Sequence, residues 1–388
     1  MIIKANLARS VALHERARAL VSAFERGEPP PESRDALACD IARFQADTID
    51  GYSRLCRARG VNITSLTCAS DIPAVPTDAF KLTRVATFEP REANVVFRTS
   101  GTTQGIEARG EHAMRDGTTY DAAAVAFGKY WLARDLAPGK VMVLVLAPSA
   151  EQVPDSSLIH MCQQFAKAFG HPASQNDTFL VQDGVINLSR FHKRVATATA
   201  QNMPILLLGT SFAYVHFLDA LDARVGAYGH TPLPAGSRVM QTGGYKGKSR
   251  EVPAAALRRE LARALRVDER EIVAEYGMTE LSSQFYERTL FDAASPKGIF
   301  AEPPWARVVP VDPNSLVPVA DGDVGIAKII DAMNVDSAVA VLTEDRVRRV
   351  VGGFELLGRA PGARARGCSI AIDELLGSTR STREKTAP

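Results

Sequence analysis

The chain has 388 residues, of which 46% are apolar and 23% charged, a composition typical of a globular protein with a sizeable core. Its 46 Lys and Arg residues almost balance its 44 Asp and Glu residues, so the formal net charge is only +2. This balance argues against a nucleic-acid-binding protein, because phosphate contacts call for an excess of clustered cations.

Hydropathy and cysteine usage exclude two further classes. The most apolar run, 141–148, is much shorter than the roughly 20 residues of a membrane-spanning helix, and the charged N-terminus does not resemble a secretory signal. The five cysteines are scattered and form no CxxC pair, so neither a disulfide framework nor a zinc site is indicated. We therefore expect a cytoplasmic protein without a membrane span.

The first 90 residues are expected to be mainly helical. Apolar residues recur at helical spacing over 7–26, and Gly27 with the prolines that follow ends this helix. A second helix is expected over 33–59. Residues 1–90 would then form a helical segment that packs on the rest.

From about Val95 the pattern becomes strand–helix alternation, which predicts an α/β fold with layered, partly parallel sheets. Beyond Trp305 the chain is rich in strands and turns. We expect an α/β core over 91–358 and a short C-terminal segment over 359–388. The expected strands are 94–97, 141–146, 205–208, 238–241 and 271–275, and the expected helices are 120–132, 157–169, 211–223 and 252–265.

The segment 97–105 has the composition of a phosphate-binding loop. It reads FRTSGTTQG and follows a predicted strand directly. Glycines let a backbone expose its N–H groups at close range, and Ser and Thr hydroxyls add donors. The segment is not a Walker A loop, since no GK[ST] follows, and an ordinary polar turn is the alternative.

A second segment, 275–280, reads EYGMTE after the strand 272–275. It brings an aromatic ring, a glycine turn, a hydroxyl and a carboxylate together, which are the groups needed to cover a purine and hold Mg²⁺. Considered alone, Glu280 is better explained as a carboxylate at a helix N-terminus, where the helix dipole favours it. Next to the first loop it becomes a candidate metal ligand.

These two motifs resemble the phosphate loop and the adenine/Mg²⁺ motif of the acyl- and aryl-acid adenylating superfamily. Further segments in the same order narrow the resemblance to the acyl-protein synthetase of the bacterial luminescence fatty-acid reductase complex, and it covers about 73–369. They read PTDAFK (76–81), GTSFA (209–213), TGGYK (242–246), GMTELSSQ (277–284) and RGCS (366–369).

The resemblance implies a role for each matching residue. The β- and γ-phosphates of ATP would lie against Ser100, Gly101, Thr102, Thr103 and Gly105. The adenine would contact Tyr276, Gly277, Met278, Gly243 and Gly244. Glu280 would bind Mg²⁺ with Thr279 near the α-phosphate, Asp345 would accept the ribose hydroxyls, and Arg359 would contact the nucleotide. The acid pocket would be lined by Gly209, Thr210, Ser211, Phe212 and Thr242.

The implied reaction joins a carboxylic acid, of which a long-chain fatty acid is one candidate, to AMP with release of pyrophosphate. Related ligases carry a C-terminal domain with a lysine that contacts the reacting carboxylate, whereas the residues after Arg359 are too few for an independent domain. Either this adenylation uses no such lysine, or Lys246 or Lys248 supplies the charge.

Cys368 matches the family's acyl-accepting cysteine. Arg364 and Arg366 nearby would favour the thiolate, which is the nucleophilic form, and the alternative is an inert cysteine on a late strand. Transfer to coenzyme A, to a carrier protein or to an amine stays open, as does a non-catalytic nucleotide-binding subunit. If Cys368 accepts the acyl group, a reductase or carrier-protein partner is expected.

Overall fold

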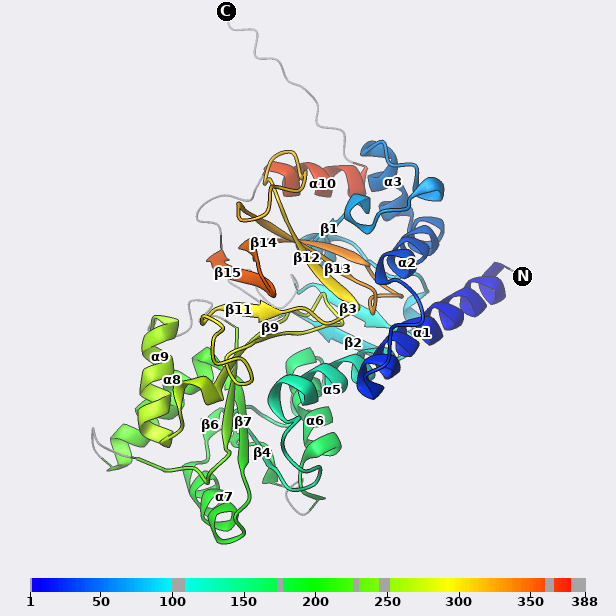
Figure 1. The fold of residues 1–388 in the computed structure, drawn as a ribbon. Coiled ribbons are helices and arrows are strands. Elements are labelled where there is room, and N and C mark those ends of the chain that lie inside the picture. The colour runs from blue at the N-terminus through cyan, green and yellow to red at the C-terminus, as the bar shows by residue number, and fades with distance from the viewer. Residues whose placement is uncertain are drawn as a thin grey trace, which may run out of the picture. The chain divides into compact units, whose positions relative to one another are not determined.

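The computed structural model describes residues 2–99, 109–172, 177–225, 230–243, 252–359 and 366–377. The chain forms two compact units whose residues lie close mainly to others of the same unit. One consists of Met1–Thr119 and Pro304–Pro388, and the other of Tyr120–Pro303. Figure 1 shows the elements of both units. The units are interleaved in sequence, whereas the three expected segments are contiguous stretches, and that segment division stays a prediction.

The unit 120–303 is built on a sheet with the strand order β11-β10-β9-β8-β7-β4. The strands β4, β7, β8 and β9 are parallel, and β10 and β11 continue the sheet in antiparallel pairing. Their bounds are β4 Met142–Val145, β7 Ile205–Thr210, β8 Arg238–Thr242, β9 Ile272–Tyr276, β10 Phe285–Glu287 and β11 Ile299–Ala301. A β5–β6 hairpin, Val181–Gln182 and Val185–Ile186, lies outside this sheet. The α/β prediction is confirmed.

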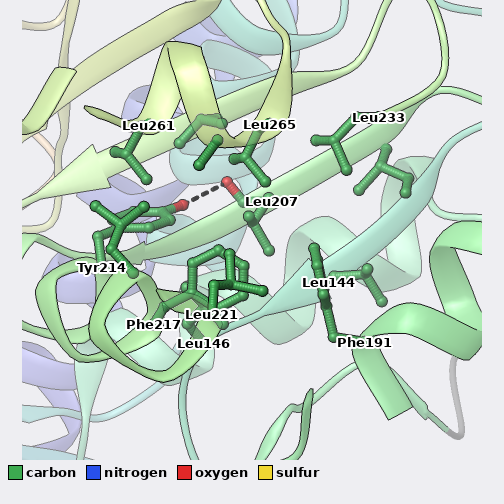
Figure 2. Packing of buried hydrophobic residues seen from close by; sticks show 14 of the residues in the cluster. Leu144, Leu146, Phe191, Leu207, Tyr214, Phe217, Leu221, Leu233, Leu261 and Leu265 are labelled. Carbon is green, nitrogen blue, oxygen red and sulfur yellow. Dashed lines mark hydrogen bonds between the residues drawn. The ribbon is translucent and has the colours of Figure 1, made fainter. Parts of the chain in front are cut away.

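Three helices cover one face of this sheet, namely α7 (Leu188–Ala200), α8 (Ser211–Val225) and α9 (Ala254–Leu265). Alternate strand residues such as Leu144 and Leu207 point to this face and pack against the apolar sides of the helices (Figure 2). The Tyr214 hydroxyl in this core donates to the Leu207 carbonyl oxygen at 2.8 Å.

The opposite face of the same sheet contacts α5 (Thr118–Leu132) and α6 (Ser157–Phe169). Tyr286 of β10 contacts both helices. Its ring centroid lies 5.8 Å from that of Phe127 of α5, and its hydroxyl lies 4.0 Å from the Met161 sulfur of α6. Each face of the sheet therefore has its own helical layer, which is the arrangement expected from strand–helix alternation.

The other unit contains an antiparallel run of β12, β13, β14 and β15, with β1 paired in parallel to β14. A separate β2–β3 pair and the helices α1 to α4 and α10 also belong to this unit. The bounds of the strands are β1 Val75–Pro76, β2 Val95–Arg98, β3 Glu111–Met114, β12 Ala306–Val311, β13 Val324–Asp331, β14 Ala340–Val350 and β15 Gly353–Arg359. The helices are α1 Ile2–Arg26, α2 Arg34–Thr48, α3 Asp50–Ala58, α4 Ala79–Leu82 and α10 Arg366–Leu376.

A buried carboxylate holds α1 to this unit. Asp336 is 3% exposed and accepts hydrogen bonds from Ser10 at 2.8 Å, from Thr87 at 3.1 Å and from His14 at 3.1 Å. Burial works to raise the pKa of Asp336, but the hydrogen bonds and nearby positive charge outweigh burial and hold that pKa below its ordinary value.

The sequence predicted the position of most elements, and the differences have local causes. The helix expected over 33–59 is two helices, because Ile49 has extended dihedral angles and separates α2 from α3. The helices α7 and α10 were not anticipated. Among the described residues, no helix combines the length and the hydropathy needed to cross a bilayer.

Candidate active site

Three of the expected site segments lie at one edge of the sheet in the unit 120–303. The parallel strands β7, β8 and β9 end at Thr210, Thr242 and Tyr276, and Thr210 pairs with Thr242 while Thr242 pairs with Glu275. Carboxyl ends of adjacent parallel strands share an edge, and in open α/β sheets this edge binds ligands. The sequence segments 209–213, 242–243 and 276–280 are therefore neighbours.

Side-chain hydrogen bonds hold the first two segments together. The Ser211 hydroxyl donates to the Gly243 carbonyl oxygen at 2.6 Å and accepts from the Gln241 side chain at 2.8 Å. Gly243 has φ +69°, a conformation that favours glycine. At Thr210 the hydroxyl accepts from the Ala213 amide at 3.1 Å and caps the start of α8.

Gly209 and Phe212 fill tightly packed positions in the expected acid pocket. A Cβ atom at Gly209 would lie 3.2 Å from the Leu146 Cβ and from the Tyr214 ring. The Phe212 ring packs edge-on against His216 with centroids 4.5 Å apart. A larger residue at 209 would displace its neighbours, so we expect substitutions of Gly209 to disturb the packing of the expected acid pocket.

A carboxyl group joins the second segment to the third. Thr242 donates a hydrogen bond to Glu275, and both side chains are less than 10% exposed. Burial raises the pKa of Glu275 to about 7, and the hydrogen bond from Thr242 limits the rise. The carboxyl is therefore partly protonated near neutral pH.

Tyr276 is 8% exposed and packs in an aromatic cluster. Its ring centroid lies 5.9 Å from that of Phe285 and 6.2 Å from that of Phe300. Gly277 follows it in the turn, and a Cβ atom there would overlap the Glu275 Oε1 atom. A side chain at 277 would therefore force the Glu275 carboxyl to move.

Glu280 lies in a turn and is only 6% exposed. The turn is closed by the Leu281 amide, which donates to the Met278 carbonyl oxygen at 3.2 Å. Residues 277–284 contain no helix, so the alternative of a carboxylate at a helix N-terminus is wrong. Among the described residues no three His, Cys, Asp or Glu side chains gather to hold a metal ion. Mg²⁺ that is mainly bound by phosphate oxygens and water needs only one carboxylate ligand from the protein.

The other unit brings together the two residues expected to contact the ribose and the nucleotide. Asp345 on β14 and Arg359 on β15 are paired across the strands, and the Arg359 Nε atom lies 3.6 Å from the Asp345 Oδ1 atom. The Asp345 amide also donates to the Thr343 hydroxyl at 3.0 Å. The Arg359 side chain is 77% exposed, so it is accessible to a ligand.

Several expected site residues lie outside the described part of the chain, namely Ser100, Gly101, Thr102, Thr103, Gly105, Gly244 and Lys246. Their roles stay predictions. Residues 366–376 form the helix α10, so the alternative of a late strand at Cys368 is wrong.

Glu275 was not singled out in the sequence, although an indication was present. It is an acidic residue in an otherwise apolar strand, Ile272–Tyr276, directly before the aromatic residue of the second motif. A charged residue in a buried strand usually requires a partner or a function. The register with Thr242 becomes visible only in the folded sheet.

Comparisons with known proteins show the family to which this chain belongs. The model of the family described as "Acyl-protein synthetase, LuxE" matches residues 35–377. The chain is 22% identical over 324 residues to the long-chain-fatty-acid–luciferin-component ligase of Aliivibrio fischeri, covering 82% of this chain and 79% of the relative.

The fold is similar to that of solved 2-hydroxyisobutyryl-CoA ligase structures. An open conformation with 2-HIB-AMP and CoA has a TM-score of 0.58 at 12% identity and covers 85% of this chain and 74% of the ligase. The thioesterification state has a TM-score of 0.58 at 15% identity, covering 89% and 68%. This likeness confirms the expected layered α/β fold. The chain belongs to the LuxE acyl-protein synthetase family, AMP-forming ligases that activate a carboxylic acid with ATP and transfer the acyl group to a thiol.

Proposed function

We propose that the protein activates a long-chain fatty acid as its acyl-adenylate and passes the acyl group to Cys368. The observation that carries the proposal is the meeting of the segments 209–213, 242–243 and 276–280 at the carboxyl edge of β7, β8 and β9. The choice of acid is supported by the relative from Aliivibrio fischeri, whose name specifies a long-chain fatty acid.

In the first step a carboxylate oxygen of the acid attacks the α-phosphorus of ATP. The bond between this phosphorus and the β-phosphate oxygen breaks, and pyrophosphate leaves. No protein nucleophile is required, so the chain acts by orienting the reactants and by stabilising charge. Thr242 and Gly243 would border the acid, and Tyr276 would support the adenine from its packed aromatic cluster.

Magnesium fits Glu280, which would hold the ion through one carboxylate. The ion supplies positive charge that offsets the charge on the phosphate oxygens. Asp345 would accept hydrogen bonds from the ribose hydroxyls, and the exposed Arg359 beside it would contact the nucleotide. The phosphate loop 100–105 would grip the β- and γ-phosphates.

In the second step the Cys368 thiolate attacks the acyl carbonyl carbon, AMP leaves, and a thioester forms. The backbone of Cys368 lies in the first turn of α10. The acyl group would then pass to a reductase or carrier-protein partner, in keeping with the term "luciferin-component" in the name of the relative. A cytoplasmic location stays a prediction.

Acid-dependent exchange of labelled pyrophosphate into ATP tests the activation step across acids of increasing chain length. The proposal predicts exchange that rises with chain length and is largest for a long-chain acid. Exchange that favours short or aromatic acids would refute the substrate assignment while leaving adenylation intact. Mass spectrometry after adding coenzyme A, a carrier protein or an amine to the pre-formed adenylate identifies any other acceptor.

A further inference from the structure

The described part of the chain contains a buried carboxyl without a cationic partner, directly beside the candidate site. Glu275 is 6% exposed and lies on β9 between Thr242 of β8 and Tyr286 of β10, which are its register partners. Residues paired across neighbouring strands point to the same face. This face is the one that contacts α5 and α6, because Ile272 on the same strand belongs to the opposite core.

Within the described ranges, the groups that bond to Glu275 or interact with it electrostatically are uncharged at neutral pH. Thr242 is its one hydrogen-bond partner among the described residues. The titratable side chains that interact with it electrostatically are Cys162 of α6 and Tyr286 of β10, and Tyr120 of α5 lies near Tyr286. Burial raises the pKa of Cys162 and of Tyr286, so both stay neutral and leave the Glu275 charge uncompensated.

A second buried carboxylate in the same sheet shows the contrast. Glu287 of β10 is 1% exposed, but it forms an ion pair with Arg258 and accepts hydrogen bonds from the Gly298 amide at 2.6 Å and the Ala274 amide at 3.2 Å. This environment stabilises a negative charge. The environment of Glu275 favours the protonated form.

The Glu275 carboxyl touches both segments that the reactants would approach. It bonds to Thr242, which leads into 243–246, and it packs under Gly277, which leads into the turn of Glu280. The Gln284 Cγ atom would lie 3.7 Å from a Cβ at the same glycine, and the buried Gln284 Oε1 atom has no hydrogen-bond partner within the described ranges. Ionisation would place a negative charge beneath the place where a carboxylate and a triphosphate must meet.

We propose that Glu275 is a positioning residue that supports acid activation only in its protonated form. The neutral carboxyl holds the ends of β8 and β9 at the correct spacing without repelling the anionic reactants. When Glu275 loses its proton, activation slows. The inference rests on the proposed adenylation function.

The test is the pH dependence of acid-dependent ATP–pyrophosphate exchange between pH 6 and pH 9. For the wild type we expect kcat/KM to fall above about pH 7, approaching tenfold per pH unit as for a single ionisation. Glu275→Gln, whose side chain is permanently neutral, should keep kcat/KM within about twofold across this range. Glu287→Gln is the matched control and should keep the wild-type decline, whatever its absolute rate.

A second variant covers the case in which Glu275→Gln fails to fold. Thr242→Val removes the hydrogen bond that lowers the pKa of Glu275, so the decline should move to higher pH. A decline in Glu275→Gln that matches the wild type, or a Thr242→Val decline that does not move, overturns the inference. Absence of exchange with every acid at every pH would instead contradict the proposed function.

Discussion

Arg54 donates two hydrogen bonds to the backbone carbonyl oxygen of Leu375, from its Nε atom at 3.0 Å and its Nη2 atom at 2.8 Å. This places a cation at the C-terminal end of α10, where the helix dipole is negative. Arg59, directly after α3, forms an ion pair at 2.6 Å with Glu374 of α10. It adds a second link between these two helices, which lie side by side (Figure 1). The helix that contains Cys368 is therefore attached to α3.

Arg54→Ala should loosen α10. The lost hydrogen bonds come from a charged group, and such bonds contribute about 1.5–3 kcal/mol. We expect amide hydrogen exchange over 366–377 to become about tenfold faster or more, measured by mass spectrometry. Arg57→Ala, an exposed residue of the same helix α3, is the control and should leave this exchange unchanged. Equal protection of 366–377 in both variants would show that Arg54 does not hold the helix.

Asp345→Ala should weaken ATP binding more than acid binding. If Asp345 accepts the ribose hydroxyls, its loss removes a charge-assisted hydrogen bond, and the KM for ATP should rise about tenfold while the KM for the acid stays constant. Steady-state pyrophosphate release measures both constants. Glu344→Ala serves as the control, because the neighbouring Glu344 side chain points to the other face of β14. A similar rise in both KM values would count against a ribose contact.

Cys368→Ser should abolish covalent labelling of the protein by a radiolabelled acid while leaving ATP–pyrophosphate exchange within about twofold. The reason is that the thiol acts only after the adenylate has formed. Hydroxylamine should release the label from the wild type, as expected for a thioester. Cys68→Ser, which changes an exposed cysteine, should label normally. Label that persists on the Cys368→Ser protein would end the assignment.

The stability of the fold should depend on pH through Glu275. Its folded pKa of about 7 lies above the ordinary value of 4.5, so the folded state binds the proton more tightly. The stabilising contribution is complete below about pH 4.5 and is lost as pH rises towards and through 7. The loss is on the order of 3 kcal/mol, since one pKa unit corresponds to about 1.4 kcal/mol.

Urea unfolding at pH 5 and pH 8 measures this effect. The free energy of unfolding of the wild type should decrease between the two values by more than that of Glu275→Gln. The difference between the proteins isolates Glu275 from other titrating groups. An equal decrease in both would mean that the carboxyl is already ionised at pH 5 in the folded state.

The sequence predicted the elements whose pattern is local. The expected strand 205–208 and helix 157–169 appear as β7 and α6 because apolar periodicity alone specifies them. The break at Ile49 was missed, since the apolar pattern continues across it. The helix α10 was missed because its packing partner α3 lies about three hundred residues earlier in the chain, and such long-range packing leaves little trace in a short window.

The candidate site was predictable to the level of segments but not of contacts. The motifs around Thr242 and Glu280 were recognised from residue type and order. The hydrogen bond from Thr242 to Glu275 depends on strand register, and the Asp345–Arg359 pair depends on a hairpin with a bulge in its pairing. The local sequence does not determine which residues of two strands pair with each other.

Acid-dependent ATP–pyrophosphate exchange by the wild type and by Glu280→Ala tests whether Glu280 holds the metal at the phosphates. Glu151→Ala, which changes an exposed residue, is the control. Loss of the buried carboxylate should lower kcat/KM at least about a hundredfold, as expected when a group that holds the metal at the phosphates is removed. Glu151→Ala should be unaffected. Near wild-type exchange by a correctly folded Glu280→Ala protein would contradict the proposed arrangement of ATP and metal at this site.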